Sequence, residues 1–227
     1  MKKDENIKHV AIIMDGNRRW AKKHHLPSMM GHKKGIETLK TIVKAASKFN
    51  IKYLTVYAFS TENWNREKSE VDFLMNLLSD TIKNELDELY DNNVKINYIG
   101  NLKQLNPNLQ KILDESEKKT KNNNGVILNV AINYGARDEM VNAIKNMVKD
   151  DVEINEKTVS KYLYTKDSPD PDLLIRTSGE KRISNFLLWQ IAYSEIYVTD
   201  TLWPDFDEEE FKKALDDFKT RKRRWGK

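Results

Sequence analysis

Cysteine is absent from the 227 residues of this chain, which excludes disulfide bonds and thiolate metal sites. No apolar run approaches the roughly 18–20 residues of a membrane span, and residues 1–10 lack the apolar centre of a secretory signal peptide. The glycine-rich patterns GxGxxG and GxxxxGKS/T are also missing, which disfavours dinucleotide and P-loop sites. Together these absences predict a cytoplasmic protein.

The composition is that of a globular chain, with 39% hydrophobic and 33% charged residues. Its length fits one domain, residues 1–227, with a sizeable core. A net charge of +4 is too small to argue by itself for a nucleic-acid partner. The charge is uneven, however, because residues 207–210 are acidic and residues 219–224 are basic. Each run most simply forms a solvated helix face, although the basic one could also meet an anionic ligand, a partner chain or acidic lipid headgroups.

Segments typical of strands and helices alternate along the chain. Apolar, β-rich runs predict strands at residues 10–14, 53–59, 94–99, 126–132 and 172–176. Apolar residues at helical spacing predict helices at residues 35–49, 71–90, 106–121, 136–148, 156–163 and 211–218. This alternation predicts an α/β fold with a central, mostly parallel, twisted sheet flanked by helices.

The most informative stretch is residues 9–21, HVAIIMDGNRRWA. Asp15 directly follows a predicted buried strand, and a Gly-Asn turn then leads to Arg18 and Arg19 at the start of a predicted helix. Ligands of open α/β sheets bind beyond the carboxyl ends of the strands, where a helix start offers N–H groups to phosphate. Asp15 adds an oxygen ligand for Mg²⁺, and the arginines add fixed positive charge. The stretch therefore predicts a magnesium-dependent phosphate or diphosphate site.

Polar residues also follow the predicted strand at residues 53–59. Ser60, Asn63 and Arg66 can bind an anion through a hydroxyl, a carboxamide and a guanidinium group. The alternative is a helix cap near Ser69, but such a cap does not explain the Asn-Trp pair, so we expect a functional role here.

A third polar cluster follows the predicted strand at residues 172–176. The loop holds Arg176 and Arg182, whose guanidinium forks match phosphate oxygens, although a merely exposed basic loop is the alternative. Glu195 lies in an otherwise apolar run and would be costly to bury unpaired, so we expect it to face a polar cleft, a cation or a subunit boundary.

Two further features have both a structural and a functional interpretation. His32, in the GHKKG segment just before the predicted helix at residues 35–49, could hydrogen-bond a phosphate oxygen, although most lone histidines are structural or exposed. The apolar stripe of the helix at residues 71–90 is ordinarily core, but a stripe that contains methionine can line an apolar tunnel.

Five segments together resemble the cis-prenyltransferase family, most closely its bacterial undecaprenyl diphosphate synthases. They are HVAIIMDGNRRWA, GHKKG, YAFSTENWNR, NYGAR and DLLIRTSGEKRISNFLLWQIAYSEIYVTDTLWPDF, in matching order from about residue 9 to residue 226. The DDxxD clusters typical of trans-prenyl synthases are absent. The resemblance implies a Mg²⁺-dependent homodimer with an apolar tunnel. It also implies that isopentenyl diphosphate units are added in cis to farnesyl diphosphate, giving undecaprenyl diphosphate, the precursor of a lipid carrier for cell-wall synthesis.

Motif positions then imply individual roles. Asp15 matches the aspartate that assists magnesium and diphosphate departure, and Asn63 matches the residue assigned as proton acceptor. Because a carboxamide is a poor base, we expect Asn63 to orient the substrate while a phosphate oxygen takes the proton. Glu195 matches a second magnesium ligand, and residues Arg224 to Gly226 match a tail that reaches a diphosphate across the dimer interface.

The other implied contacts form four groups. Those matched to the allylic diphosphate are Gly16, Asn17, Arg18, Arg19, Trp20, Ser28 and His32. Those of the second substrate loop are Ser60, Thr61, Glu62, Trp64 and Arg66. Those matched to isopentenyl diphosphate are Arg176, Arg182, Ile183 and Ser184. The tunnel wall is matched by Ile36, Ala58, Val94 and Val126, with Leu74, Met75 and Leu78 opposite.

The chain departs from the family pattern at two positions of the first group. Arg18 stands where many bacterial members have glycine, and Ser28 stands where many have an arginine. We hypothesise that Arg18 offsets the cation missing at Ser28.

Two alternatives follow. One is a family member with another product length. The other is a nucleic-acid-binding protein, which would leave Asp15 and Glu195 unexplained, so we expect no nucleic-acid partner. An apolar product that still carries a diphosphate must reach the bilayer, so transient contact with the inner face of the membrane is expected.

Overall fold

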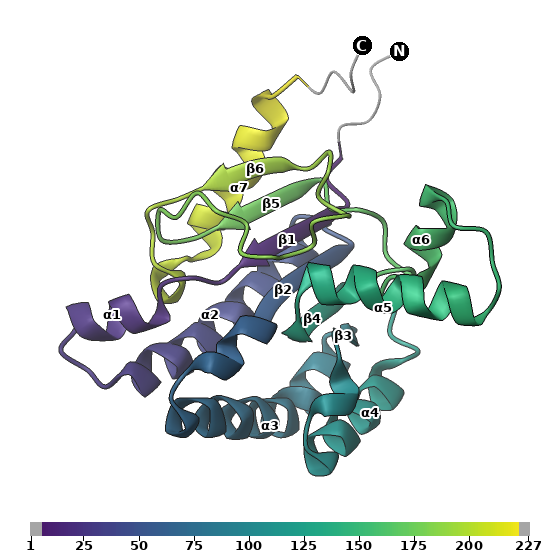
Figure 1. Ribbon diagram of the computed structural model, residues 1–227. Helices are drawn as coiled ribbons and strands as arrows, with labels where there is room; N and C mark the ends of the chain where they lie inside the picture. The colour runs from purple at the N-terminus through teal and green to yellow at the C-terminus, as the bar shows by residue number, and fades with distance from the viewer. Residues whose placement is uncertain (1–5, 223–227) are drawn as a thin grey trace.

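Within residues 6–222, which the computed structural model describes, six strands form one sheet in the order β3-β4-β2-β1-β5-β6 (Figure 1). Every neighbouring pair of strands is parallel. The strands are β1 (His9–Ile13), β2 (Tyr53–Ser60), β3 (Lys95–Ile99), β4 (Ile127–Tyr134), β5 (Leu173–Arg176) and β6 (Glu195–Val198). The predicted α/β class is confirmed. β6 was not predicted, because it occupies only four residues of a longer apolar run.

Helices cover both faces of the sheet (Figure 1). One layer consists of α2 (Ser28–Lys48), α3 (Lys68–Asp91), α4 (Pro107–Thr120) and α7 (Glu208–Thr220), with α1 (Asn17–Lys23) beside α2. The opposite face is covered by α5 (Ala136–Lys149), against which α6 (Glu156–Tyr162) packs. None of the helices in the described part of the chain is long and apolar enough to cross a bilayer.

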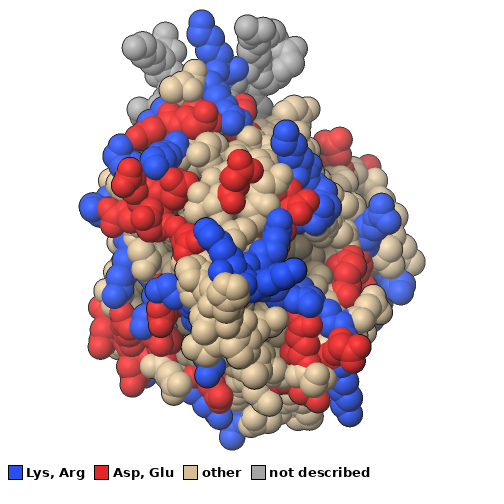
Figure 2. All heavy atoms as spheres, turned by 90° about the vertical axis from the view of Figure 1, so that its left-hand side faces the viewer, with Lys and Arg blue, Asp and Glu red and all other residues tan. Residues whose placement is uncertain are grey.

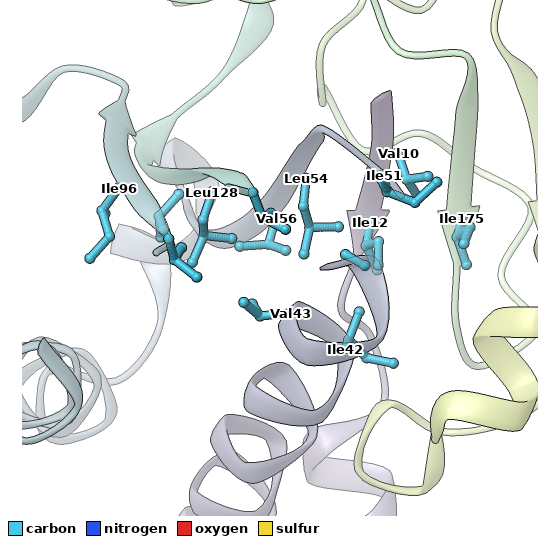
Figure 3. Packing of buried hydrophobic residues seen from close by; sticks show 14 of the residues in the cluster. Val10, Ile12, Ile42, Val43, Ile51, Leu54, Val56, Ile96, Leu128 and Ile175 are labelled. Carbon is cyan, nitrogen blue, oxygen red and sulfur yellow. The ribbon is translucent and has the colours of Figure 1, made fainter. Parts of the chain in front are cut away.

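The core follows from the alternation of side chains along each strand. Val10 and Ile12 of β1 belong to the large cluster under α2, whereas Ala11 and Ile13 belong to the cluster on the opposite face. Both faces are buried, so β1 is apolar throughout, as is usual in parallel sheets. Figure 3 shows side chains of α2 lying beneath those of the central strands.

Helix α2 begins at Ser28, seven residues earlier than its apolar periodicity predicted. Gly31, the first glycine of the GHKKG segment, is predicted to precede the helix, but it lies within the helix. A Cβ atom on Gly31 would lie 2.0 Å from the carbonyl oxygen of Asn17, so this glycine lets α1 approach the backbone of α2. His32 consequently projects from a helix rather than from the loop before it.

A row of buried polar side chains crosses the sheet near the amino ends of its strands. His9 Nε2 lies 2.7 Å from the hydroxyl of Thr55, which accepts a hydrogen bond from Asn129 Nδ2 at 3.0 Å. Asn129 Oδ1 in turn accepts from Asn97 Nδ2 at 3.1 Å. A slip of one residue in strand pairing would leave these buried groups unpaired, so the row favours a single register.

The buried His9 should make stability depend on pH. Burial lowers its pKa from 6.5 to about 4, so the unfolded chain binds this proton first on acidification. Its contribution is complete above pH 6.5 and is lost as the pH falls toward 4, by about 2 kcal/mol at pH 5. We expect urea unfolding of His9→Gln to show a correspondingly shallower loss of stability between pH 7 and pH 5. Equal slopes for both proteins would contradict a neutral buried imidazole.

Candidate active site

Three polar clusters meet at the carboxyl edge of the sheet. Asp15 follows β1, Ser60 ends β2 and Arg176 ends β5, and because the strands are parallel these ends lie together. A cavity of about 570 Å³ is lined by all three residues. A second cavity of about 1010 Å³ adjoins it and is lined mainly by residues 14–28. Asp15, Asn17, His32 and Arg66 line both cavities.

Asp15 is held between two arginines. Its Oδ2 accepts a hydrogen bond from Arg176 Nη2 at 2.9 Å, and its Oδ1 lies 3.3 Å from Arg19 Nη2. Burial acts to raise the pKa of Asp15, but the hydrogen bond and charge of Arg176, together with Arg19, outweigh it and leave the pKa below its ordinary value. The carboxylate is therefore ionised at neutral pH and stands among fixed positive charges.

Arg176 is the best-buried cation of the site, with only 5% of its side chain exposed. Besides Asp15, it donates hydrogen bonds to Ser184 Oγ at 2.9 Å and to the carbonyl of Arg182. The residues matched to isopentenyl diphosphate are thereby brought together around one guanidinium group. Ile183 is the exception, because it packs against the hydrophobic cluster of the opposite face instead of lining the cavity.

Thr177 holds the Asp15 loop in place and was missed by sequence reasoning. Its hydroxyl accepts a hydrogen bond from the Asp15 amide at 2.9 Å and donates one to the Asp15 carbonyl at 2.6 Å. The residue is fully buried. A hydroxyl directly after Arg176, at the end of a strand, was the only signal in the sequence.

Three buried polar atoms in the described chain have no hydrogen-bond partner although their residues line the 570 Å³ cavity. They are Asn17 Oδ1, His32 Nε2 and Arg176 Nε. Burial, followed by the charge of Arg66, lowers the pKa of His32 to about 4, so its imidazole is neutral at pH 7. These groups can bind a polar ligand that enters the cavity, because burying them unpaired is unfavourable.

Glu70 of α3 lies between two arginines at the mouth of the site. Its carboxylate is 3.0 Å from Arg66 Nη1 and 3.8 Å from Arg18 Nη1. Sequence reasoning missed Glu70, because only the fold brings the start of α3 beside α1. Arg18 and Ser28 both line the larger cavity, and compensation between them stays a prediction.

The segment after β2 has structural roles that we did not expect. Asn63 Oδ1 accepts a hydrogen bond from the Ser60 amide at 3.1 Å and so caps a 3₁₀ turn at Thr61–Asn65. Trp64 donates to Asn133 Oδ1 at 2.7 Å and packs edge-on against Phe59. A local cap therefore accounts for Asn63, whereas Trp64 is held by its contacts with β2 and β4. Asn63 also lines the 570 Å³ cavity, whereas Trp64 does not.

The other members of this loop divide in the same way. Glu62 and Arg66 line the 570 Å³ cavity, and Glu62 Oε1 accepts a hydrogen bond from Asn185 Nδ2 at 2.9 Å. Thr61 does not line it, and its hydroxyl lies 3.2 Å from Glu62. Trp20 also lies away from the cavities, because its indole donates to Asp205 Oδ1 at 2.6 Å.

Glu195 does not lie near Asp15 within one chain. It begins β6 and is level with Leu173, the first residue of β5, whereas Asp15 lies beyond the carboxyl end of β1. About 3.3 Å per strand residue puts roughly 15 Å between their levels. Glu195 instead forms an ion pair with Arg221 at 3.0 Å. The cation that pairs with Glu195 in the described chain is thus an arginine, and its role as a magnesium ligand stays a prediction.

The donor set fits a Mg²⁺ ion that takes most of its ligands from a substrate. In the described residues no group of three or more histidine, aspartate or glutamate side chains could hold a metal ion. Asp15 offers one carboxylate, 29% exposed, at the junction of two cavities lined by cations. One or two carboxylates plus phosphate oxygens and water is the usual mode of Mg²⁺ binding.

An apolar passage leads from the site between α2, α3 and the sheet. A cavity of about 120 Å³ is lined by Ile36, Ala58, Leu74, Met75 and Leu78, among others. A deeper cavity of about 60 Å³ shares Ile36, Leu39 and Thr81 with it and reaches Val94. Six of the seven residues matched to a tunnel wall therefore line these cavities. Val126 does not, because it is buried in the core cluster under the sheet.

The outer side of the deeper cavity is closed by ion pairs between α2 and α3. Lys40 Nζ lies 2.6 Å from Glu85 and 2.9 Å from Glu88, and Lys44 Nζ lies 2.7 Å from Glu88. All four side chains line the cavity. We call this group the α2–α3 ion-pair seam. Because its members are partly exposed to water, each pair stabilises the seam only weakly.

Comparison with known proteins shows similarity over nearly the whole chain. A family model described as "Putative undecaprenyl diphosphate synthase" matches residues 13–226. An isoprenyl transferase of Fusobacterium nucleatum is 53% identical over 225 residues, covering 98% of this chain and 97% of that protein. One of Clostridium perfringens is 51% identical over 230 residues, covering 98% of this chain and 91% of that protein.

Solved structures give the same picture. Lavandulyl diphosphate synthase from Lavandula x intermedia, in complex with dimethylallyl diphosphate, superposes with a TM-score of 0.94 at 36% identity and covers 99% of this chain and 100% of that one. A probable undecaprenyl diphosphate synthase from Campylobacter jejuni superposes with a TM-score of 0.85 at 37% identity, and the two chains cover each other fully. Arg224 and Gly226, matched to the family's tail, lie outside the described residues.

Proposed function

Because the chain belongs to the undecaprenyl diphosphate synthase family of isoprenyl transferases, we propose that it adds isopentenyl diphosphate units in cis to farnesyl diphosphate. One observation carries the proposal: two cation-lined cavities meet at Asp15, and an apolar passage leads away from them. Two diphosphates and one growing hydrocarbon chain require these three compartments. The dimethylallyl diphosphate in the lavender structure supports an allylic diphosphate as one of the ligands.

The allylic diphosphate is assigned to the cavity formed by residues 14–28. Arg18 and Arg19 supply charge there, and the neutral imidazole of His32 can donate to or accept from a phosphate oxygen. The prenyl tail then enters the apolar passage, which begins beside Asn17 and His32. This placement orients the reacting carbon toward the neighbouring cavity.

Isopentenyl diphosphate is assigned to the second cavity. Arg176, Arg182 and Ser184 line it and present two guanidinium groups and a hydroxyl. Arg176 already donates to Asp15 and Ser184, so its orientation is set before substrate binds. Holding two substrates in adjacent cavities converts an encounter in solution into a reaction between positioned groups.

The reaction needs negative charge to be stabilised on the leaving diphosphate. As the allylic carbon–oxygen bond breaks, the fixed arginines of the first cavity stabilise that charge without rearranging. The π electrons of isopentenyl diphosphate form the new carbon–carbon bond, and the proton lost afterwards passes to a diphosphate oxygen. Asn63 orients the substrate, because a carboxamide is too weak a base to take the proton. Mg²⁺, held by Asp15 and diphosphate, would supply additional Lewis-acid stabilisation of the leaving group.

The product and assembly are further parts of the proposal. We assign undecaprenyl diphosphate, a precursor of the cell-wall lipid carrier, as the product, with a different chain length as the alternative. A homodimer is supported by three exposed apolar side chains, Val141, Ile144 and Val148, on one face of α5. The role that the resemblance implies for Arg224 and Gly226 at a dimer interface stays a prediction, because both lie outside the described residues.

Incubation of the purified chain with farnesyl diphosphate and labelled isopentenyl diphosphate tests this function. We expect diphosphate release and incorporation of label into a polyprenyl product, both abolished by chelation and restored by Mg²⁺. Chromatography of the dephosphorylated product then reports the chain length. If no label is incorporated with Mg²⁺ present, the proposal is refuted. Salt-sensitive RNA binding like that of a basic peptide would favour the nucleic-acid alternative.

Enlarging a side chain at the head of the passage should shorten the product. Ala58 is exposed to both the 570 Å³ and the 120 Å³ cavities, so Ala58→Leu narrows the entrance to the apolar passage. Each addition of isopentenyl diphosphate that presses the growing prenyl product against the new leucine methyl groups should slow by about 10- to 200-fold. Product chromatography should therefore show shorter chains, with Ala58→Ser as the size-matched control. An unchanged distribution for Ala58→Leu would place the growing chain elsewhere.

A further inference from the structure

A helical hairpin formed by α1 and α2 projects from the side of the molecule (Figure 1). Residues 22–30, at its tip, are nine consecutive exposed positions. Three of them are large and apolar, since Leu26, Met29 and Met30 are 41%, 48% and 43% exposed. Exposed apolar residues scattered singly need no explanation, but three within five positions at a convex tip do.

The charged residues of the hairpin segment itself all have the same sign. Residues 16–36 contain six lysine and arginine residues and no aspartate or glutamate. In the described part of the chain, no carboxylate lies within ion-pair distance of Lys22, Lys23 or Lys33. Figure 2, which faces this side of the molecule, shows lysine and arginine side chains gathered at the centre of the face, above an uncharged projection. The tip thus combines an apolar point with unpaired basic charge.

We propose that this hairpin tip docks on an anionic lipid bilayer. Its apolar side chains would insert among the headgroups, while the lysines contact anionic headgroups around them. Charge complementarity favours an anionic bilayer, because the tip joins exposed apolar side chains with lysines and contains no carboxylate.

The position of the tip gives the docking a use, which rests on the proposed function. Lys22 and Leu26 line the 1010 Å³ cavity on one side, whereas Lys23, Met29 and Met30 do not line any of the site cavities. Docking would therefore turn the opening of the substrate site toward the bilayer and would leave the site free to bind substrate. An amphiphilic diphosphate with a long prenyl chain could then pass between site and membrane over a short path.

Flotation with lipid vesicles tests the proposal on the full chain without substrates. We expect the protein to float with vesicles of phosphatidylcholine mixed with phosphatidylglycerol and not with phosphatidylcholine alone. Added NaCl should weaken the binding, because surface charges are screened. Lys23→Gln/Lys33→Gln should weaken it about 25-fold, since each lysine near an anionic surface contributes about a fivefold factor. Met29→Ser/Met30→Ser should also reduce flotation.

The controls are Lys111→Gln on α4 and Ile154→Ser, which remove one exposed lysine and one exposed apolar side chain away from the hairpin. Both should float like the parent protein, and all variants should keep the parent thermal midpoint and transfer rate with soluble substrates. Failure of the parent to float, equal binding to both vesicle types, or parent-like flotation of both hairpin variants would overturn the proposal. The proposal would also be overturned if the parent protein bound no vesicles and the hairpin variants lost the binding of a protein partner instead. A chain that floats but transfers no prenyl group would refute only the proposed function.

Discussion

Replacement of Asp15 by alanine is expected to lower the turnover of prenyl transfer about 1000-fold, because a preorganised charged group is lost at the leaving diphosphate. The carboxylate stands between Arg176 and Arg19 at the junction of both cavities, and no other carboxylate in the described residues shares that position. Steady-state kinetics with farnesyl and isopentenyl diphosphates measures the effect. Turnover within about tenfold of the parent would mean that the leaving group is stabilised elsewhere.

Asp15→Asn separates charge from shape in the same experiment. The carboxamide retains an oxygen that can accept from Arg176, so the fold around it should persist. Removal of a negative charge beside two arginines should leave diphosphate binding unchanged or tighter when Mg²⁺ is absent. We therefore expect the turnover number to fall without a rise in the Michaelis constant for farnesyl diphosphate. A rise in that constant with unchanged turnover would assign Asp15 to ground-state binding.

Gly31→Ala is expected to damage both the fold and the activity severely, although it adds only one methyl group. The added Cβ would lie 2.0 Å from the carbonyl oxygen of Asn17 and 2.8 Å from its carbon, and backbone atoms cannot turn aside as a flexible side chain can. Separation of α1 from α2 should lower the free energy of unfolding by about 3 kcal/mol. Because α1 carries Arg18 and Arg19, a displacement of about 1 Å should lower turnover about 100-fold.

Urea unfolding and kinetics on the same samples measure both effects. Lys34→Ala, an exposed position on the same helix, is the matched control and should change stability by less than about 0.5 kcal/mol. If Gly31→Ala keeps its stability but loses turnover, the shift is confined to α1. If it keeps both, the contact between α1 and α2 is looser than the structure describes.

The fold could be predicted from sequence largely because parallel strands are buried on both faces. Five such strands appear as short apolar runs, and the helices between them show clear periodicity. The start of α2 could not be predicted in this way. Gly31 lets the backbones of α1 and α2 approach closely, and the sequence alone does not distinguish such a glycine from one in a loop. β6 was missed because its four residues lie inside a longer apolar run that hides its boundaries.

The site could be predicted where a polar residue directly follows a strand, as at Asp15 and Arg176. Such positions must meet at one edge of a parallel sheet. Contacts between distant segments left no local signal, so Glu70 and Thr177 were missed. Glu195 was assigned to Mg²⁺ from resemblance, but its place at the amino end of β6 depends on strand register. Asn63 and Trp64 show the reverse case, in which residues interpreted as functional also serve the local fold.

The α2–α3 ion-pair seam bears on how an elongating enzyme can measure its product. The deeper cavity, at about 60 Å³, holds the volume of about two water molecules. If the chain elongates a prenyl product as proposed, a lengthening product would have to part α3 from α2 at the seam. Product length would then be limited by the work of separating α2 from α3 rather than by a fixed cavity volume.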